Sequence, residues 1–337
     1  MKPTNFARYM SMYLTEFLPG VKGVSYNTIA SKRDTYMLLL KYLKEYQNIK
    51  PEAVDIPLLS TEVITDFLEW LETVRNSSIS TRNIRLAAIK SLFSYIQMQT
   101  PDYIYQCQQI LSIPRKKEPE HNLEYLAVDG IKAVLDIVDT STRQGLRDLT
   151  LLSIMYDSAA RVQEIADLCV NDFRMEKPST LRLTGKGQKT RIIPLMNTTA
   201  DLLSKYIKIF HPQHQGEQGI PLFSNRNRTK LTRAGISYIL NKYVALAKQK
   251  NPTLIPETVS PHGLRHSKSM HMLQAGVPLI YIRDFLGHSE ISTTEIYARC
   301  DSEQKRKAIE ATCPNITKAD VPLWHSDSSL MEWLQSL

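Results

Sequence analysis

One stretch of this chain, residues 261–299, constrains the fold of the whole sequence more than any other. It places His262, Arg265 and His266 on one turn of a predicted helix. Residues three and four apart share a helix face, so the three side chains can point at a single ligand. Arginine presents a planar fork of donors, and an imidazole can donate or accept, so we expect that ligand to be an anion.

The same stretch continues through a second apolar helix to Gly287 and His288, and a third short segment ends near Tyr297. Each residue has an ordinary alternative. The chain has 16 tyrosines, and a tyrosine is more often packed or on the surface than a nucleophile. Two histidines four apart could bind zinc, but Gly263 follows His262 where an HExxH motif needs glutamate. The informative feature is therefore the ordered combination of His-x-x-Arg-His, Leu-Gly-His-Ser and Thr-Thr-x-Ile-Tyr.

This combination resembles the carboxyl-terminal signature of the tyrosine recombinases, also called the phage integrase family. The positions that carry the resemblance are Pro261, His262, Leu264, Arg265, His266, Leu286, Gly287, His288 and Tyr297. It is strong from Leu151 to Arg299 and is one of layout before that. The resemblance implies a mainly α protein: an N-terminal helical core-binding (SAM-like) domain precedes a mixed α/β catalytic domain with a small antiparallel sheet.

Length and charge agree with such a protein. At 337 residues and 38.6 kDa, the chain can bury two separate cores. The 42 Lys and Arg against 34 Asp and Glu give a net charge of +8, which suits a polyanionic partner but supports nucleic-acid binding only weakly by itself. The four cysteines show no CxxC spacing, so we expect a reducing, cytoplasmic setting. No segment looks like a signal peptide or a membrane span.

The amino-terminal third, residues 1–112, is predicted to be all helix. Apolar residues recur at helical spacing over residues 6–18, and Pro19 ends that helix. Ser25 or Asn27 can cap a second helix that reaches about Tyr46.

Two further helices are predicted in this third, opened by Ser60 and capped by Ser80. The last one carries Arg82, Arg85 and Lys90 among small and polar residues, a pattern expected where a helix lies against a DNA backbone. The alternative is a solvated basic face. The family resemblance favours the DNA interpretation.

Residues 113–124 are polar, contain two prolines and read as an interdomain linker. The linker carries Arg115, Lys116 and Lys117. A basic, extended linker can cross a DNA backbone, so we expect the two domains to close around a duplex as a clamp.

After the linker, residues 125–318 form the predicted catalytic domain. Helices are expected over 128–138 and 143–156, and the second is so apolar that it belongs in the core. A new helix then begins at Arg161, which Glu164 can orient through a charge-assisted bond one turn later. Arg161 matches the first arginine motif of the family, although Ala159 stands where that motif has glycine.

The clearest strand signal surrounds a glycine-rich turn. Residues 180–183 and 190–195 alternate apolar and polar side chains and predict a hairpin with Lys186 at its tip. In the resemblance, a lysine of this hairpin reaches the active site, and Lys186 matches better than Lys189. A basic cluster ahead of a helix over residues 234–248 predicts contacts with the DNA backbone. That cluster includes Arg226, Arg228 and Lys230.

The resemblance also implies a reaction at a DNA phosphodiester. Tyr297 is the expected nucleophile, forming a covalent 3′-phosphotyrosine and releasing a 5′ hydroxyl. Attack builds negative charge on the nonbridging oxygens, which Arg161 and Arg265 are expected to clamp. Because the phosphotyrosine retains the energy of the broken bond, no metal or other cofactor is implied.

The remaining positions have implied roles in proton transfer and support. His262 is the leading proton acceptor for the tyrosine, and Lys186 the donor to the departing 5′ oxygen. His288 is expected to bond a nonbridging oxygen, with Glu164 and His266 in support. The expected partners are double-stranded DNA with inverted-repeat core sites and further copies of the chain or a related recombinase, in a tetramer.

Residues 319–337 form a tail with a short amphipathic helix, which can pack on its own core or on a neighbouring subunit. The resemblance favours docking on the neighbour. Two other functions share part of this pattern. A type IB topoisomerase uses the same chemistry as a monomer, and a non-catalytic DNA-binding protein could keep the scaffold. Every expected active-site position carries a residue of the required type, which argues against the non-catalytic DNA-binding protein.

Overall fold

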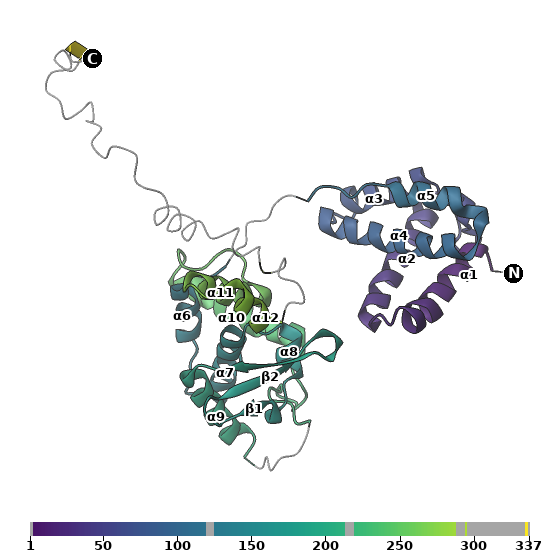
Figure 1. Ribbon diagram of the computed structural model, residues 1–337. Coiled ribbons are helices and arrows are strands. Elements are labelled where there is room, and N and C mark those ends of the chain that lie inside the picture. The colour runs from purple at the N-terminus through teal and green to yellow at the C-terminus, as the bar shows by residue number, and fades with distance from the viewer. Residues whose placement is uncertain (1–2, 119–124, 213–218, 288–293, 295–333, 336–337) are drawn as a thin grey trace. The chain divides into compact units, whose positions relative to one another are not determined.

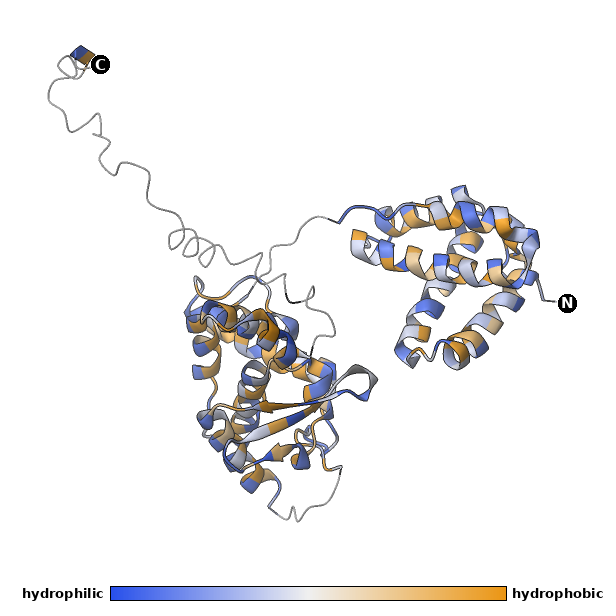
Figure 2. Ribbon diagram, viewed as in Figure 1, coloured by the Kyte–Doolittle hydropathy of each residue, from blue (hydrophilic) through white to orange (hydrophobic). Residues whose placement is uncertain are grey.

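The computed structural model describes residues 3–118, 125–212, 219–287, 294 and 334–335. The chain divides into two compact units, Met1–His121 and Asn122–Leu337 (Figure 1). Each unit has a buried apolar core of its own. Figure 2 shows apolar residues on the helix faces that look into each unit. Two separate cores are what a chain of this length can support.

The first unit is helical. Its long elements are α1 (Asn5–Met12), a π-helical segment (Tyr13–Val21), α2 (Tyr26–Tyr46), α3 (Thr61–Thr73), α4 (Ile79–Gln99) and α5 (Ile104–Ser112). Short 3-10 turns lie at Pro51–Ala53, Ile56–Leu58 and Pro101–Tyr103. Helix α4 packs against α2, α3 and α5. Tyr36, Leu39 and Leu43 of α2 are buried, and the contacts of α4 with three other helices place it at the centre of this unit.

Two predicted boundaries in this unit are wrong. The first helix was expected to stop at Pro19, but the chain continues to Val21 as a π-helical segment, where the Lys22 amide donates to the Phe17 carbonyl at 3.0 Å. The wider turn accommodates a proline, which has no amide proton to donate. Helix α4 is capped by Ser78 instead of Ser80, since the Ser78 hydroxyl accepts from the Thr81 amide at 3.2 Å.

The second unit surrounds one central helix. Its helices are α6 (Val128–Asp136), α7 (Arg143–Ser158), α8 (Val162–Asp167), α9 (Asn197–Phe210), α10 (Arg233–Lys250), α11 (Pro261–Gln274) and α12 (Leu279–Leu286), with a 3-10 turn at Val170–Asp172. Helix α7 contacts α6, α8, α9 and α11. Leu151, Leu152, Ile154 and Met155 on it are buried. The predicted core helix therefore supports the segments on either side of it.

A small antiparallel sheet completes this unit. Strands β1 (Phe173–Arg174), β2 (Thr180–Thr184) and β3 (Thr190–Pro194) lie in that order, and β2 and β3 form the predicted hairpin, closed by the turn Lys186–Gln188. The short strand β1 was not predicted. Leu181 pairs with Ile193, and Leu183 pairs with Arg191. Because paired residues share a face, Arg191 lies on the side of the sheet that is otherwise buried.

Candidate active site

Arg161 stands at the junction between α7 and α8. It is the N-cap of α8, and its amide donates to Glu164 Oε2 at 2.8 Å. Its guanidinium donates to Glu164 Oε1 at 3.0 Å. The side chain of Arg161 keeps 38% of its surface exposed, whereas that of Glu164 keeps 3%. The predicted pair is thus present: a buried carboxylate holds the arginine while part of its fork faces outward.

Glu164 has a second arginine partner that sequence reasoning missed. Arg191 on β3 donates to Glu164 Oε1 at 2.8 Å and to Oε2 at 2.7 Å. Burial by itself would raise the pKa of the Glu164 carboxyl. The hydrogen bonds and charge of Arg191, and then of Arg161, outweigh burial and hold that pKa below its usual value. The carboxylate is therefore ionised at neutral pH, and two guanidinium groups share it.

Arg265 lies at the bottom of the site. It is on α11, is 1% exposed, and donates to the Ala159 carbonyl at 2.7 Å and to the Leu286 carbonyl at 2.6 Å. Ala159 adopts the left-handed conformation, with φ of 47°, at the end of α7. That conformation favours glycine, which explains the glycine of the family motif at this position. Arg265 thereby joins the segment before Arg161 to the end of α12.

His262 and His266 face each other on the first turns of α11. Their ring centroids are 4.3 Å apart in an edge-on arrangement. Neighbouring protein atoms desolvate the His262 ring, and Arg265 and Arg161 add positive charge, so the pKa of His262 lies below its ordinary value of 6.5. His262 is an exposed residue, yet it lies close enough to Arg265 and Arg161 for their charges to lower its pKa. The structure therefore brings Arg161, Arg265 and His262 together.

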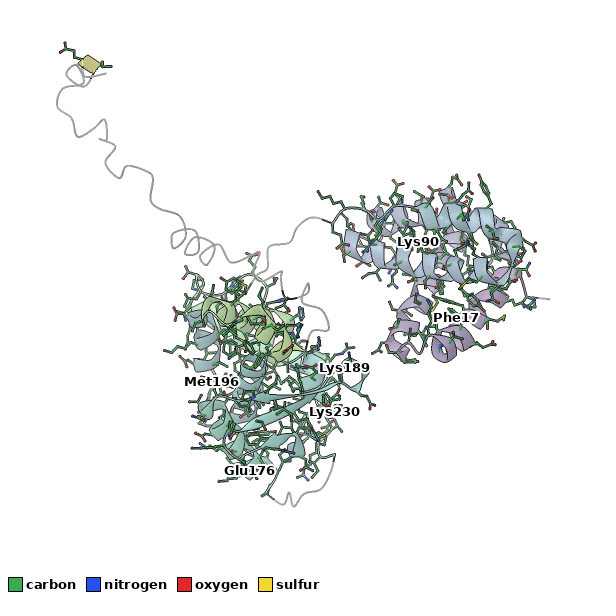
Figure 3. The ribbon with its side chains drawn as sticks, in the orientation of Figure 1. Phe17, Lys90, Glu176, Lys189, Met196 and Lys230 are labelled. Carbon is green, nitrogen blue, oxygen red and sulfur yellow. The ribbon has the colours of Figure 1, made fainter. Side chains whose placement is uncertain are left out.

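The β2–β3 hairpin lies close to Glu164 and Arg161 at Gly185, where its turn begins. A Cβ atom on Gly185 would lie 2.9 Å from Glu164 Oε1 and 3.7 Å from the Arg161 guanidinium. Lys186, the next residue, begins the turn, but its side chain lies outside the described part of the structure and its role stays a prediction; Lys189, labelled in Figure 3, follows the turn. Gly287 closes α12 in the left-handed conformation with φ of 65°.

Two expected members of the site, His288 and Tyr297, lie outside the described residues. The same holds for most of the predicted tail helix, of which only Leu334 and Gln335 are described, as helical and exposed. The roles predicted for these positions stay predictions.

The basic residues predicted on α4 hold helices and linker together. The guanidinium of Arg85 donates to the Ser31 carbonyl at 3.0 Å, and the ammonium of Lys90 donates to the Leu111 carbonyl at 2.6 Å. Arg82 is buried and donates to Asn83 Oδ1 and to the Pro114 carbonyl. The phosphate contact of Arg82 stays a prediction, and in this conformation its guanidinium bonds groups of the protein itself.

Residues 113–118 of the predicted linker lie against α3 and α4. The amide group of Asn83 brackets Lys116, donating to its carbonyl at 2.8 Å and accepting from its amide at 3.1 Å. The Lys116 ammonium pairs with Glu72 at 2.7 Å. Arg115 is 3.8 Å from Glu118, and both Arg115 and Lys117 are exposed. This part of the linker extends the first unit, and Arg115 and Lys117 remain available to a ligand.

The basic cluster ahead of α10 is exposed at all three predicted positions. Arg228 lies in a turn with φ of 58°. Arg226 donates to Gln144 at 3.3 Å, and Lys230 pairs with Asp167. Figure 3 labels Lys230. The side chain of Lys230 is 46% exposed, so this ion pair is weak and can exchange for a phosphate.

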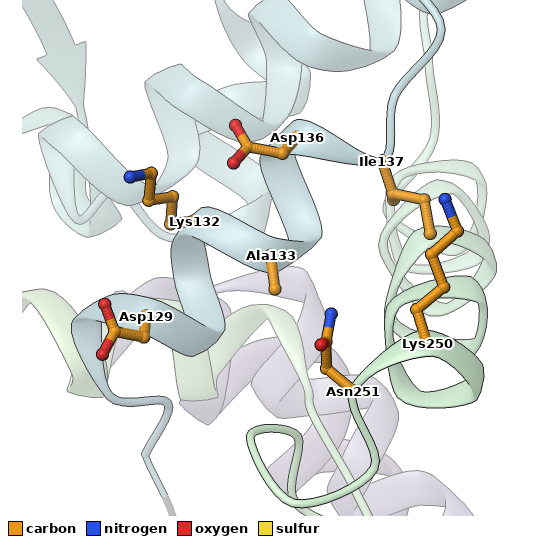
Figure 4. Close-up of a pocket in the computed structure, with 7 residues that line it drawn as sticks. All are labelled: Asp129, Lys132, Ala133, Asp136, Ile137, Lys250 and Asn251. Carbon is orange, nitrogen blue, oxygen red and sulfur yellow. The ribbon is translucent and has the colours of Figure 1, made fainter.

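Two surface pockets lie elsewhere in the second unit. One, of about 280 Å³, is lined by residues of α6 and the end of α10, including Asp129, Lys132 and Lys250 (Figure 4). The other, of about 330 Å³, includes Tyr156 and Lys268. Neither contains Arg161, Arg265 or His262. No group of three or more His, Cys, Asp or Glu that could hold a metal ion occurs among the described residues. Within the same ranges, no helix is long and apolar enough to cross a membrane.

Comparisons with known proteins agree with this geometry. The phage integrase family matches residues 124–304. The y4rC protein of Sinorhizobium fredii is 32% identical over 336 residues, which cover 100% of this chain and 99% of that protein. Tyrosine recombinase XerD of Listeria monocytogenes is 32% identical over 289 residues, 83% of this chain and 90% of that protein.

Solved structures share the fold. The XerH site-specific recombinase, bound to palindromic difH substrate in a post-cleavage complex, has a TM-score of 0.66 at 22% identity over 89% of this chain and 84% of that chain. The Tn1549 transposon integrase, in complex with transposon right end DNA, has a TM-score of 0.68 at 15% identity over 91% and 99%. The predicted fold class is confirmed. The chain therefore belongs to the phage integrase family and is a tyrosine recombinase, an enzyme of site-specific DNA recombination.

Proposed function

We propose that this chain cuts and rejoins double-stranded DNA at inverted-repeat core sites through a covalent bond between Tyr297 and a 3′ phosphate. The observation that carries the proposal is the meeting of Arg161 with Arg265 and His262, two segments of the chain that lie about a hundred residues apart in the sequence. A buried carboxylate fixes one guanidinium and two backbone carbonyls fix the other. Fixed cationic donors suit an anion whose charge grows during reaction.

In the proposed reaction, the tyrosine oxygen attacks phosphorus and the bond to the 5′ oxygen breaks. Arg161, whose fork is partly exposed, meets a nonbridging oxygen first. Arg265 is closed off in the free chain, so the surface over it has to open when DNA binds. Both arginines then stabilise the charge that develops on the phosphoryl oxygens.

Two proton transfers accompany the strand cut. The lowered pKa of His262 keeps its ring neutral at pH 7, so the ring can accept the proton of Tyr297. Lys186 gives a proton to the departing 5′ oxygen, and His288 bonds a nonbridging oxygen. Rejoining runs the same steps in reverse with a 5′ hydroxyl from another strand.

The proposal assigns residues 1–112 to a core-binding domain, 113–124 to a linker, 125–318 to the catalytic domain and 319–337 to a tail. Exposed cations at Arg115, Lys117, Arg226 and Arg228 contact the DNA backbone. Four copies assemble on paired sites, with the tail docked on a neighbour. Truncation after Asp327 should then abolish cooperative assembly but preserve binding to a single site. Unchanged cooperativity would refute the docking.

Covalent trapping tests the nucleophile. Mapping the attachment point on genomic DNA supplies the site, and a nicked duplex of that site traps the adduct because the released fragment diffuses away. Tyr297→Phe should abolish the adduct and retain DNA binding. Tyr281→Phe is the matched control, since Tyr281 is exposed on α12 of the same unit. An adduct that persists in Tyr297→Phe would reassign the nucleophile.

A further inference from the structure

One charged side chain lies where the strand pattern calls for an apolar one. Arg191 is directly opposite Leu183 across the hairpin, on the face that also carries the buried Leu181 and Ile193. Its side chain is only 13% exposed. A buried guanidinium is costly unless it is paired and hydrogen-bonded, so its partners explain why it is there.

Those partners come from two other segments. Both terminal nitrogens of Arg191 reach the Glu164 carboxylate, at 2.8 and 2.7 Å, and its Nε donates to the Phe285 carbonyl at 3.1 Å. Gly287 is packed against the same side chain, since a Cβ there would lie 3.0 Å from Arg191 Cδ. One guanidinium thus joins strand β3, the first turn of α8 and the last turn of α12.

We propose that Arg191 is a positioning residue for the strand cut, one that aligns the hairpin bearing Lys186 with the phosphate clamp at Arg161. The inference rests on the proposed function. Glu164 Oε1 accepts from Arg161 and from Arg191, so a single carboxylate oxygen links the two arginines. Gly185, the residue before Lys186, has no room for a side chain beside that oxygen. Arg191 therefore fixes the position of the hairpin relative to Arg161.

The consequence concerns the leaving group. When the phosphorus–oxygen bond breaks, the electron pair stays on the 5′ oxygen, which then needs the proton that Lys186 supplies. A shift of the hairpin takes the donor away from that oxygen, and a misplacement of about 1 Å can cost roughly a hundredfold in rate. A 5′ sulfur in place of that oxygen leaves as a thiolate without a proton. Such a substrate separates loss of the proton donor from loss of the clamp.

Arg191→Lys is the variant of choice, because an ammonium keeps the charge but cannot span both carboxylate oxygens and the Phe285 carbonyl. We expect single-turnover cleavage of the ordinary nicked duplex to fall about a hundredfold, with DNA affinity unchanged. On the 5′-phosphorothiolate duplex, the rate should return to within about tenfold of the wild type, as it should for Lys186→Ala. Arg161→Ala should stay slow on both substrates.

Arg182→Lys is the matched control. Arg182 lies on β2 of the same hairpin and pairs with Asp172, but its side chain is 56% exposed. It should cleave both duplexes like the wild type. If Arg191→Lys does not fold, Arg191→Gln carries the same comparison, because an amide can still donate to Glu164 and Arg161 keeps its counterion.

The outcomes separate the inference from the function beneath it. If Arg191→Lys cleaves the 5′-phosphorothiolate duplex nearly as fast as the wild type does, the alignment role is supported. A variant that is slow on both duplexes, or as fast as the wild type on ordinary DNA, overturns it. If instead the wild type forms no covalent adduct, or Lys186→Ala is slow on both duplexes, the proposed chemistry is at fault.

Discussion

The bracket between Asn83 and the linker can be tested directly by removing one side chain. Asn83 is 1% exposed, and its amide group makes four hydrogen bonds: it donates to the Lys116 carbonyl and to Glu118, and it accepts from the Lys116 amide and from Arg82. Asn83→Ala deletes all four. Because Arg82 and Glu118 have other partners, the main loss falls on the backbone of Lys116.

The size of the effect follows from those contacts. A net hydrogen bond is worth about 0.5–1.5 kcal/mol, and a partly buried backbone group left without a partner costs about 1–3 kcal/mol. The free energy that keeps residues 113–118 against α4 should therefore fall by about 2–3 kcal/mol. At 1.4 kcal/mol for each factor of ten, the Lys116 amide should exchange with solvent roughly 30- to 150-fold faster.

Hydrogen exchange read at the Lys116 amide measures this, and trypsin should cut faster after Arg115 and Lys116. Asn5→Ala is a suitable control, because Asn5 is in the same unit but makes one exposed bond, to Tyr103. An unchanged exchange rate at Lys116 in Asn83→Ala would show that the bracket does not hold the linker.

Three further predictions concern the active site. Glu164→Gln should lower the free energy of unfolding in urea by about 3 kcal/mol, because two buried or half-buried arginines lose their counterion; a loss below about 1 kcal/mol would contradict this. The pKa of Glu164 in the folded protein lies below the ordinary 4.5, so the carboxylate stabilises the fold fully above pH 4.5 and loses that effect as pH falls through the folded pKa. The free energies of unfolding of the wild type and Glu164→Gln should therefore converge at low pH. Single-turnover cleavage should be flat down to pH 6.5 and decline only below it, as His262 protonates, and His262→Ala should lose that limb; a midpoint above 6.5 would refute the assignment. Gly185→Ala should push on Glu164 and slow cleavage roughly tenfold while binding persists, whereas Gly20→Ala, with open space around it, should have no effect.

Local patterns predicted the elements well where they reflect burial. The apolar run of α7 and the alternation in β2 and β3 identify core positions, and both elements lie where they were expected. The errors fall where neighbouring signals compete. Ser78 and Ser80 can both cap a helix, and only the Ser78 hydroxyl reaches an amide three residues on. At Pro19 the sequence shows a helix breaker, but the helix continues to Val21 in a wider turn.

Only those site residues that belong to a motif with a recognisable spacing could be predicted from the sequence. Motif spacing identified Arg161 and Glu164, which are hydrogen-bonded to each other, and Arg265, which bonds the Ala159 carbonyl two residues before Arg161. Arg191 was missed because its partner Glu164 is 27 residues away and belongs to another element. One signal was present: an arginine in the inward register of a strand requires a buried anion. The basic face of α4 shows the same limit, since a row of cations looks alike in the sequence whether it binds phosphate or a carbonyl, and Arg82 here bonds the Pro114 carbonyl.

The two bonds of Arg265 to main-chain oxygens bear on how this protein can change over evolutionary time. Every residue type supplies the same carbonyl, so the two bonds do not themselves select the side chains at positions 159 and 286; burial of both, and the left-handed conformation at 159, restrict those side chains instead. Insertions or deletions in the turns after α7 and α12 would move those oxygens and release the arginine. Descendants of this chain should therefore tolerate an exchange of alanine for glycine at position 159 better than a change in the length of the turn that holds it.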